Sequence, residues 1–215
     1  DARRDGVYDS NSVSIFERDF LAKHISQGLI DPNDIHLIVS LKYDGISVEN
    51  TVKGSTIISS CSRGDTANNE ASDLTPILGG MEFHRAKNAN IEDKEFGIKF
   101  EYIITDYNLN RIRQRFGIDY VNRRNAVIGI FGRLDARQLR DYLTPVPLES
   151  SLNVDRITEI EFLNRYYTKG ETLRYIEVRG NYSQVLYQVN EFVKEANTLR
   201  EMMPFAYDGV VVEYF

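Results

Sequence analysis

Lys42 is the side chain in this sequence with the clearest potential for covalent chemistry. It follows the largely apolar run 35–41 and precedes Tyr43-Asp44-Gly45, a segment typical of a turn. A lysine ammonium has no lone pair, but burial, a neighbouring cation or a bound metal ion can favour the free amine. Such an amine attacks phosphorus, and its attack on the α-phosphate of a nucleotide would give a lysine–AMP phosphoramide.

The residues after Lys42 suit the approach of a ligand. Gly45 lets the chain turn sharply beside a bound group, because glycine has no side chain. Asp44 can orient a ribose, a metal ion or the lysine. The tetrapeptide alone is a weak signal and is more typical of an ordinary turn after a strand. Its chemical interpretation therefore depends on two later polar segments, Ser62-Arg63-Gly64-Asp65 and Asp208-Gly209.

The composition limits the class of protein. The chain has 215 residues, an apolar fraction of 42% that can fill a core, and a formal charge of −6, which does not favour polyanion binding over the whole surface. We see neither a membrane-spanning apolar run nor a signal-peptide pattern, and we expect an intracellular protein with no membrane partner. Cys61 is the only cysteine, and the three histidines lack metal-ligand spacing.

Arginines are concentrated in the middle of the chain, where two interpretations stay open. One is a solvated arginine face on helices, and the other is a surface that follows the phosphates of a nucleic acid. The residues concerned are Arg111, Arg113, Arg115, Arg123, Arg124, Arg133, Arg137 and Arg140.

Hydrophobic periodicity predicts short strands with a few helices, which is the α+β class with antiparallel sheets enclosing a cleft. Helices are expected from Asn11 or Ser12 to Gln27 and at 109–116, 134–142 and 183–200, with 125–132 ambiguous. Strands are expected at 35–42, 46–52, 56–62, 96–105 and 210–214, with further candidates at 157–162 and 172–178. Residues 1–10 are expected to form a polar tail, residues 63–95 to be mostly irregular, and Pro145 and Pro147 to break the chain.

Five motifs follow one another along the chain: Lys42–Gly45, Ser62–Asp65, Phe100-Glu101-Tyr102, Asn122–Gly129 with Arg133-Leu134-Asp135, and Arg200 with Met203-Pro204 and Tyr207–Glu213. Together they resemble the nucleotidyltransferase (adenylation) domain of bacterial and phage NAD-dependent DNA ligases. In that family the corresponding patterns are Lys-Leu-Asp-Gly, Thr-Arg-Gly-Asp-Gly, a strand with a glutamate, Asn-Pro-Arg-Asn-Ala-Ala-Ala-Gly, and Ile-Asp-Gly-Val-Val-Val-Lys. The resemblance covers roughly residues 10–215 and implies a two-lobed fold with antiparallel sheets around a nucleotide cleft.

The resemblance implies roles for individual residues. Lys42 would be the adenylated nucleophile, with Asp44 and Asp208 as catalytic partners. The nucleotide would be bound by Ser40, Arg63, Glu101 and Val211. Phosphate or DNA contacts would come from Arg124, Arg133 and Arg200, and a magnesium ion would be held by Glu101 and Asp208. Structural alternatives remain open: a surface ion pair of Arg63 with Asp65, a solvent-facing Glu101, core packing by Val211 and a solvated Arg124.

Three positions depart from the family pattern. Ser40 stands where the family has a glutamate that recognises the adenine amino group. Glu213 stands where a lysine neutralises the α-phosphate, and such a charge reversal can cost on the order of several kcal/mol in a low-dielectric site. Gly132 stands where an arginine is expected, although Arg133 next to it can substitute.

The resemblance also implies cofactors and partners. NAD and Mg²⁺ would take part in the reaction, and nicked double-stranded DNA would be the substrate, in replication or repair in the cytoplasm of a bacterial or phage-infected cell. We do not recognise the N-terminal nicotinamide-mononucleotide-binding domain, nor the oligonucleotide-binding (OB), zinc-finger and helix-hairpin-helix domains. A second polypeptide carrying them, or a larger nucleic-acid machine, is therefore an expected partner.

Three interpretations remain open at this point. The first is a divergent, phage-type ligase adenylation subunit or fragment. The second is a catalytically degenerate ligase-like fold that serves as a binding or structural subunit. The third is another nucleotidyltransferase, for RNA ligation or capping.

Overall fold

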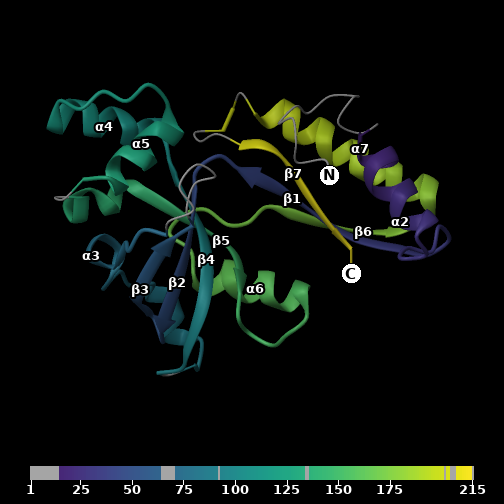
Figure 1. Cartoon of the computed structure of the whole chain (residues 1–215), viewed down its shortest axis with the longest axis horizontal. Helices are drawn as coiled ribbons and strands as arrows, with labels where there is room; N and C mark the ends of the chain where they lie inside the picture. The colour runs from purple at the N-terminus through teal and green to yellow at the C-terminus, as the bar shows by residue number, and fades with distance from the viewer. Residues whose placement is uncertain are drawn as a thin grey trace. The chain divides into compact units, whose positions relative to one another are not determined.

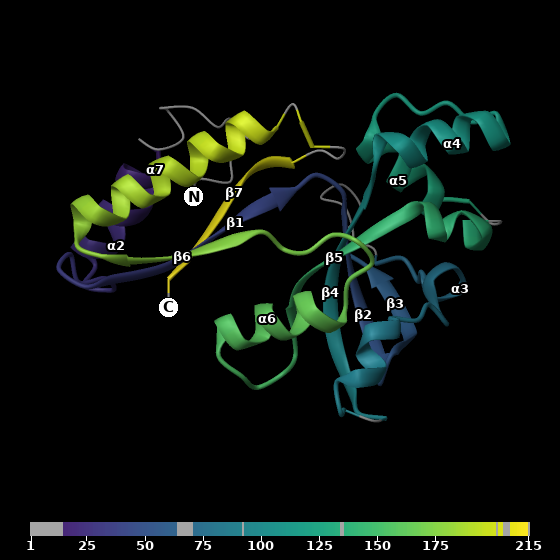
Figure 2. The same cartoon turned by 180° about the vertical axis from the view of Figure 1, so that it is seen from behind.

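The computed structural model describes residues 15–63, 71–91, 93–133, 136–200, 202–203 and 207–214. The chain divides into two compact units, unit 1 (Asp1–Tyr43 and Arg174–Phe215) and unit 2 (Asp44–Leu173). Each unit contains its own antiparallel sheet (Figures 1 and 2), so the predicted α+β class is confirmed. Several predicted features lie outside the described residues: the 1–10 tail, the helix start at Asn11 or Ser12, Gly64-Asp65, Leu134-Asp135 and Pro204.

Unit 1 is built on a three-stranded sheet in the order β6-β1-β7. The strands are β1 (Ile35–Tyr43), β6 (Tyr175–Gly180) and β7 (Tyr207–Tyr214). The central strand β1 is almost entirely buried, as its apolar run predicts. The strands predicted at 35–42 and 210–214 are confirmed, and the candidate at 172–178 is shifted towards 175–180.

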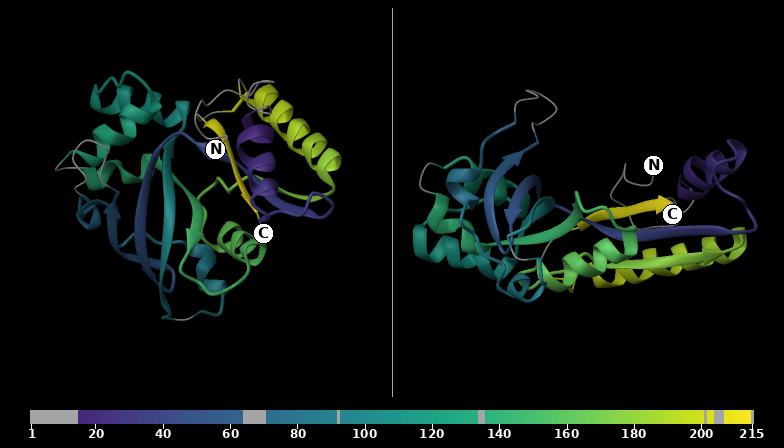
Figure 3. Two further views of the ribbon diagram at one scale, coloured as in Figure 1. Left: turned by 45° about the vertical axis from the view of Figure 1, so that its right-hand side comes forward. Right: turned by 90° about the horizontal axis from the view of Figure 1, so that it is seen from below.

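Helix α7 (Tyr182–Leu199) packs against β6 and β1 of unit 1 and runs alongside them (Figure 3). A capping box starts it: the Gln184 backbone N–H donates to the Asn181 side chain, and the Asn181 N–H donates to the Gln184 side chain. Its buried residues are Val185, Val189, Val193 and Ala196, the apolar face that the sequence predicts.

The first helical segment of unit 1 differs from the single helix that the sequence predicts. It is a π-helical segment, η1 (Phe16–Ala22), that continues as the short α2 (Lys23–Ser26). The rings of Phe20 and His24 lie 6.2 and 5.4 Å from the ring of Tyr214 on β7. These ring contacts attach η1 and α2 to the sheet.

Unit 2 is built on a four-stranded sheet in the order β3-β2-β4-β5. The strands are β2 (Ile46–Lys53), β3 (Thr56–Ser62), β4 (Glu95–Ile104) and β5 (Leu143–Ser150). Every second residue of β4, from Phe96 to Ile104, is buried in the core. Because side chains alternate along a strand, Glu101 points to the opposite side of the sheet. We call this opposite side the open face of the sheet.

A polar network inside the core of unit 2 connects three strands. The amide nitrogen of buried Asn50 donates to the carbonyls of Val48 and Ile98, at 2.9 and 3.2 Å. Its amide oxygen accepts from the hydroxyls of Ser60 and Tyr102. Because both ends of the amide are satisfied, the network fixes how β2, β3 and β4 are paired without leaving a buried polar group alone.

The helices of unit 2 lie between and after its strands (Figure 1). They are α3 (Thr75–Leu78), η2 (His84–Asn88), α4 (Asp106–Phe116), α5 (Arg123–Phe131), η3 (Ala136–Tyr142) and α6 (Arg156–Tyr166). The ambiguous stretch 125–132 is thus mostly helical, and α4 starts earlier than predicted because Thr105 accepts a capping bond from the Asn108 N–H.

Two predictions for unit 2 are wrong. Residues 157–162 belong to helix α6, where Asp155 caps the first turn and Ile160 and Leu163 bury one face. The prolines at 145 and 147 lie within strand β5, paired with Tyr102 and Phe100 of β4. Because β5 is an edge strand with a partner on only one side, it tolerates the missing N–H groups.

Among the described residues, no helix has the length and apolar character that a bilayer crossing requires.

Candidate functional site

Lys42 lies at the end of β1 in unit 1, next to an irregularity in the sheet. It pairs with Gly209 of β7, and the register then shifts between Lys42 and Tyr43. Asp208 lies at this bulge, with Oδ1 3.8 Å from the Lys42 Nζ. The two side chains are 38% and 42% exposed, so the amine is held beside a carboxylate and remains accessible.

Ser40, Lys42, Val211 and Glu213 share one face of the unit 1 sheet. Ser40 pairs with Val211 and Ile38 pairs with Glu213, and residues directly opposite one another in an antiparallel pair point to the same side. Ser40 is buried, at 3% exposure. The structure therefore brings the predicted nucleophile, Ser40 and Val211 to one face of the unit 1 sheet.

The register also bears on the charge reversal at Glu213. Its partner Ile38 is four positions before Lys42 on β1, which places Glu213 about 13 Å from the level of Lys42 along the strand. Glu213, which is half-buried, therefore lies well beyond the few ångströms at which its charge would act most strongly on the Lys42 amine.

Arg200 caps the C-terminal end of α7 and lies near the start of β7. Burial raises the pKa of Tyr207, while the charges of Arg200 and Arg174 act in the lowering direction. The guanidinium of Arg200 is therefore within electrostatic range of the residue that precedes Asp208.

The second half of the Lys-x-Asp-Gly motif belongs to unit 2, where it is bonded to Glu101. The Gly45 N–H donates to Glu101 Oε1 at 3.1 Å, and the Ser47 hydroxyl donates to Oε2 at 2.7 Å. A side chain at position 45 has no room, since a Cβ there would lie 2.1 Å from the carbonyl oxygen of Tyr102. The glycine is therefore required for the close approach of two backbones.

Opposing effects set the protonation of Glu101. Burial raises its pKa, whereas the bonds from Ser47 and the Gly45 N–H, and the charge of Lys99, lower it. The negative charge of Asp44 adds a smaller raising effect. Each carboxylate oxygen accepts one bond within the protein and keeps a further lone pair, so Glu101 can still accept from a ribose hydroxyl or bind a cation.

The motif at residues 122–125 forms the start of α5 and faces Asp44. The Asn122 side chain caps the helix by accepting from the Asn125 N–H at 2.8 Å. Arg123 donates two hydrogen bonds to Asp106, which lower the pKa of that carboxyl. Arg124, which is 56% exposed, has its Nε 3.8 Å from Asp44 Oδ1. Two motifs that are far apart in the sequence thus meet in unit 2.

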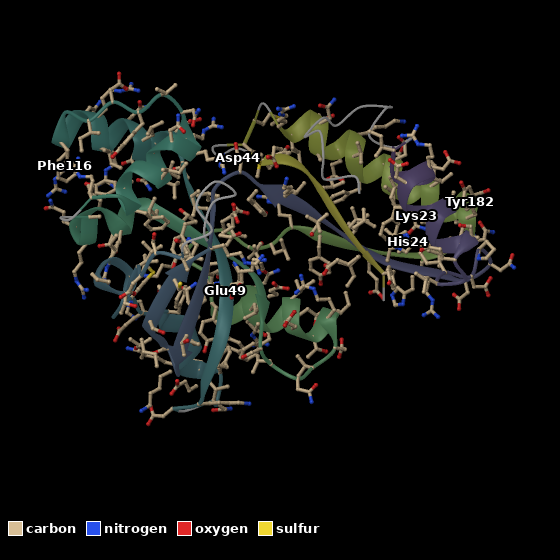
Figure 4. The ribbon with its side chains drawn as sticks, viewed as in Figure 1. Lys23, His24, Asp44, Glu49, Phe116 and Tyr182 are labelled. Atoms are coloured by element: carbon tan, nitrogen blue, oxygen red, sulfur yellow. The ribbon has the colours of Figure 1, made fainter. Side chains whose placement is uncertain are left out.

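Two other predicted phosphate-binding arginines have less definite surroundings. The Arg63 guanidinium lies 3.2 Å from Glu49 on β2, a labelled residue in Figure 4, and both side chains are more than half exposed. The alternative pair with Asp65 lies outside the described residues. Arg133 follows α5, with its N–H bonded to the Ile130 carbonyl.

A magnesium ion would find few protein ligands ready for it. Within the described ranges, no three side chains of His, Cys, Asp or Glu gather into a metal cluster. Mg²⁺ normally keeps several waters and takes one or two carboxylates plus phosphate oxygens of the substrate. The carboxylates of Glu101 and Asp208 fit that mode of binding, each in its own unit.

Ser47 is a site residue that the sequence analysis missed. It pairs directly with Glu101 across β2 and β4, which puts its hydroxyl on the open face. The signal in the sequence was its position two residues after Gly45, on the same side of a strand. Sequence alone does not give the register that brings position 101 opposite it.

Replacement of Ser47 by alanine is expected to raise the pKa of Glu101 further, because the ionised form loses a donor. Since the folded pKa is already raised, the stability from Glu101 is fully present below its ordinary value of 4.5 and is lost as pH rises through the folded value. Ser47→Ala should therefore cost about 1.5–3 kcal/mol at neutral pH and clearly less at about pH 4. Urea unfolding across this range measures the difference.

Ser59→Ala is the matched control, since Ser59 is an exposed serine of the neighbouring strand β3. Its effect should stay within about 0.5 kcal/mol at every pH. An equal cost of Ser47→Ala at both ends of the pH range would show that its hydroxyl does not stabilise the ionised carboxylate.

Comparison with known proteins gives one curated relative. The chain is 25% identical to a DNA ligase of Thermosipho africanus (strain TCF52B) over 215 residues, which cover 97% of this chain and 30% of the ligase. The chain thus spans less than a third of that relative's length. No model of a protein family matches the chain.

Two solved structures share the fold. Pmar-Lig_PreS3 has a TM-score of 0.53 at 14% identity and covers 89% of this chain and 40% of its own. Pmar-Lig_Pre. has a TM-score of 0.50 at 12% identity and covers 95% of this chain and 46% of its own. The chain therefore has a ligase-like fold and a distant similarity to a DNA ligase.

Proposed function

We propose that this chain is the adenylation part of a DNA ligase, in which Lys42 takes an adenylyl group from NAD and passes it to the 5′-phosphate at a DNA nick. The observation that supports this proposal most strongly is that motifs far apart in the sequence meet within each unit. In unit 1, Asp208 lies beside Lys42, and in unit 2, Glu101 accepts a bond from Gly45. The distant similarity to a DNA ligase supports the proposal.

The proposed reaction proceeds in two displacements at the same phosphorus. The Lys42 amine, after losing a proton, forms a bond to the α-phosphorus of NAD. The phosphoanhydride P–O bond breaks, and nicotinamide mononucleotide leaves with the electron pair. An oxygen of the DNA 5′-phosphate then attacks the phosphorus, and the N–P bond to Lys42 breaks. Asp208, at 3.8 Å, is placed to orient the lysine before the first attack.

The other residues would bind the nucleotide rather than react with it. Val211 and Ser40 share the face of Lys42, so an adenine stacked on the valine would meet a neutral hydroxyl at position 40. Glu101 would accept from ribose hydroxyls, and Arg63, Arg124, Arg133 and Arg200 would contact phosphates. A magnesium ion held by Asp208 or Glu101 would, when bound, neutralise phosphate charge.

We propose a divergent, phage-type member of the ligase family, while the departures at Ser40, Gly132 and Glu213 favour the alternative of a catalytically degenerate ligase-like subunit. Sealing of a nick would also need parts of a ligase beyond this segment, since the relative is much longer than the matched region. These parts would come from elsewhere in the same polypeptide or from a partner protein. The chain alone is expected to complete only the first displacement.

The intact mass of the chain after incubation tests the proposal. The purified protein is mixed with Mg²⁺ and either NAD or ATP, with and without a nicked duplex. We expect a gain of one adenylyl group with NAD, which the chain alone keeps when the nicked duplex is added. Labelling by ATP alone would point to a different nucleotidyltransferase, and no labelling by either nucleotide would favour a ligase-like binding subunit.

A further inference from the structure

Most of the arginines in the middle of the chain are engaged inside unit 2. Three of them pair with carboxylates: Arg113 with Asp119, Arg123 with Asp106 and Arg124 with Asp44. Two more donate to backbone carbonyls: Arg137 to Pro76, and Arg140 to Ile77 and Gly79. These contacts neutralise or anchor the side chains, so the arginines do not form one continuous phosphate-binding face.

Arg111 and Arg115 of α4 are held by aromatic rings instead. Among the described residues, neither has a carboxylate within the 4.0 Å of an ion pair. The Arg111 guanidinium lies 5.6 Å from the ring centre of Tyr107 and 5.1 Å from that of Tyr142. Arg115 lies over the Phe116 ring at 5.5 Å and donates to the Tyr142 hydroxyl at 3.1 Å. Both guanidinium groups are held against rings, and neither is paired with a carboxylate among the described residues.

Tyr107, Arg111 and Arg115 lie four residues apart along α4, so they form a line on one side of the helix. We call them the α4 stripe. All three are exposed, and Tyr107 is 70% exposed, while Ile112, about 100° around the helix from Arg111, is buried in the core. Successive members are about 6 Å apart along the axis. Figure 4 marks Phe116 at the C-terminal end of this helix.

The stripe has the chemistry of a nucleic-acid contact. A guanidinium held by rings loses little conformational entropy when it binds a phosphate, and its planar donors match phosphate oxygens. An acidic peptide would satisfy the two charges equally well but would give the exposed tyrosine no matching surface. Sugars and bases pack well against such a ring. The chain as a whole carries a net charge of −6, so the two positive charges of the α4 stripe stand out from a net negative charge.

We propose that the α4 stripe docks the sugar–phosphate backbone of double-stranded DNA, with Arg111 and Arg115 on phosphates and Tyr107 against a sugar. The choice of a duplex rests on the proposed ligase function. The docking itself is independent of Lys42, because it involves no covalent step. Loss of adenylation and loss of docking can therefore be told apart in the same preparation.

The affinity of the 215-residue chain for a fluorescent duplex, measured at several salt concentrations, tests the proposal. Arg111→Gln with Arg115→Gln should weaken binding by about tenfold at moderate salt and lower the log–log salt slope by about 1.8, the value for two lost phosphate contacts. Tyr107→Ala should weaken binding without changing the salt slope. All these variants should accept an adenylyl group from NAD as the unmodified chain does.

Arg113→Gln is the matched control, since Arg113 is on the same helix but is paired with Asp119 at 3.0 Å. It should leave both affinity and slope almost unchanged. Arg111→Glu with Arg115→Glu, checked by thermal melting, should abolish binding in a folded protein.

Several outcomes would overturn the inference. They are no binding of duplex by the unmodified chain at low salt, equal losses in the Arg113 control, tighter binding of a single strand than of the duplex, and equal binding of polyglutamate.

Discussion

Lys42→Arg is expected to abolish adenylyl transfer to the chain, with a loss of about a thousandfold or more. Arginine keeps the positive charge and the strand-end position, but its guanidinium stays protonated and has no lone pair with which to attack phosphorus. Lys42→Ala should give the same loss. The rate of labelling with isotopically labelled NAD measures both variants, and the part-exposed position of Lys42 predicts that both remain folded.

Lys53→Arg is the control for this substitution. Lys53 likewise lies at the end of a strand, β2, and is followed by a turn, but it belongs to none of the motifs. Its replacement should leave the labelling rate within about twofold of the unmodified chain. If Lys42→Arg labels as fast as Lys53→Arg, another side chain is the nucleophile.

Gly45→Ala is expected to destabilise the chain by about 3–5 kcal/mol. A Cβ at this position would lie 2.1 Å from the Tyr102 carbonyl oxygen, which is backbone and cannot rotate away. Relief of the clash separates β2 from β4 and strains the bond from the Gly45 N–H to Glu101. Urea unfolding measures the loss, which is large beside the total stability of a typical domain.

Gly132→Ala provides the comparison within the same unit. A Cβ at Gly132 would meet no atom closer than 3.5 Å, and its φ of −86° suits any residue. We expect a change within about 0.5 kcal/mol. Similar values for the two alanine variants would contradict the close packing of Gly45 against β4.

The strands were largely predictable from the sequence because their signal is local. The apolar run of β1 and the alternation in β2 and β4 each depend on neighbouring residues alone. β5 was missed because two prolines normally break a strand, and only its position at the sheet edge makes them acceptable. That position is a property of the whole sheet and is not written in the segment itself.

The candidate site was predictable as a set of motifs but not as a set of contacts. Lys42, Glu101 and Asp208 were identified from their motifs, whereas Ser47 emerged only from the register of β2 against β4. The arginine-rich stretch shows the same limit. Its positive charge is evident from the sequence. The sequence does not show that Arg113 pairs with Asp119 of the following loop, whereas Arg111 lies over the ring of Tyr142.

Peptide mapping of the adenylated chain tests the central claim most directly. The protein is incubated with NAD and Mg²⁺, digested, and analysed by tandem mass spectrometry under alkaline conditions that preserve a phosphoramide bond. The account predicts one adenylyl group, on the Lys42 side chain, that is released by acid. An adenylyl group on any other residue, or none after incubation with NAD, would contradict it.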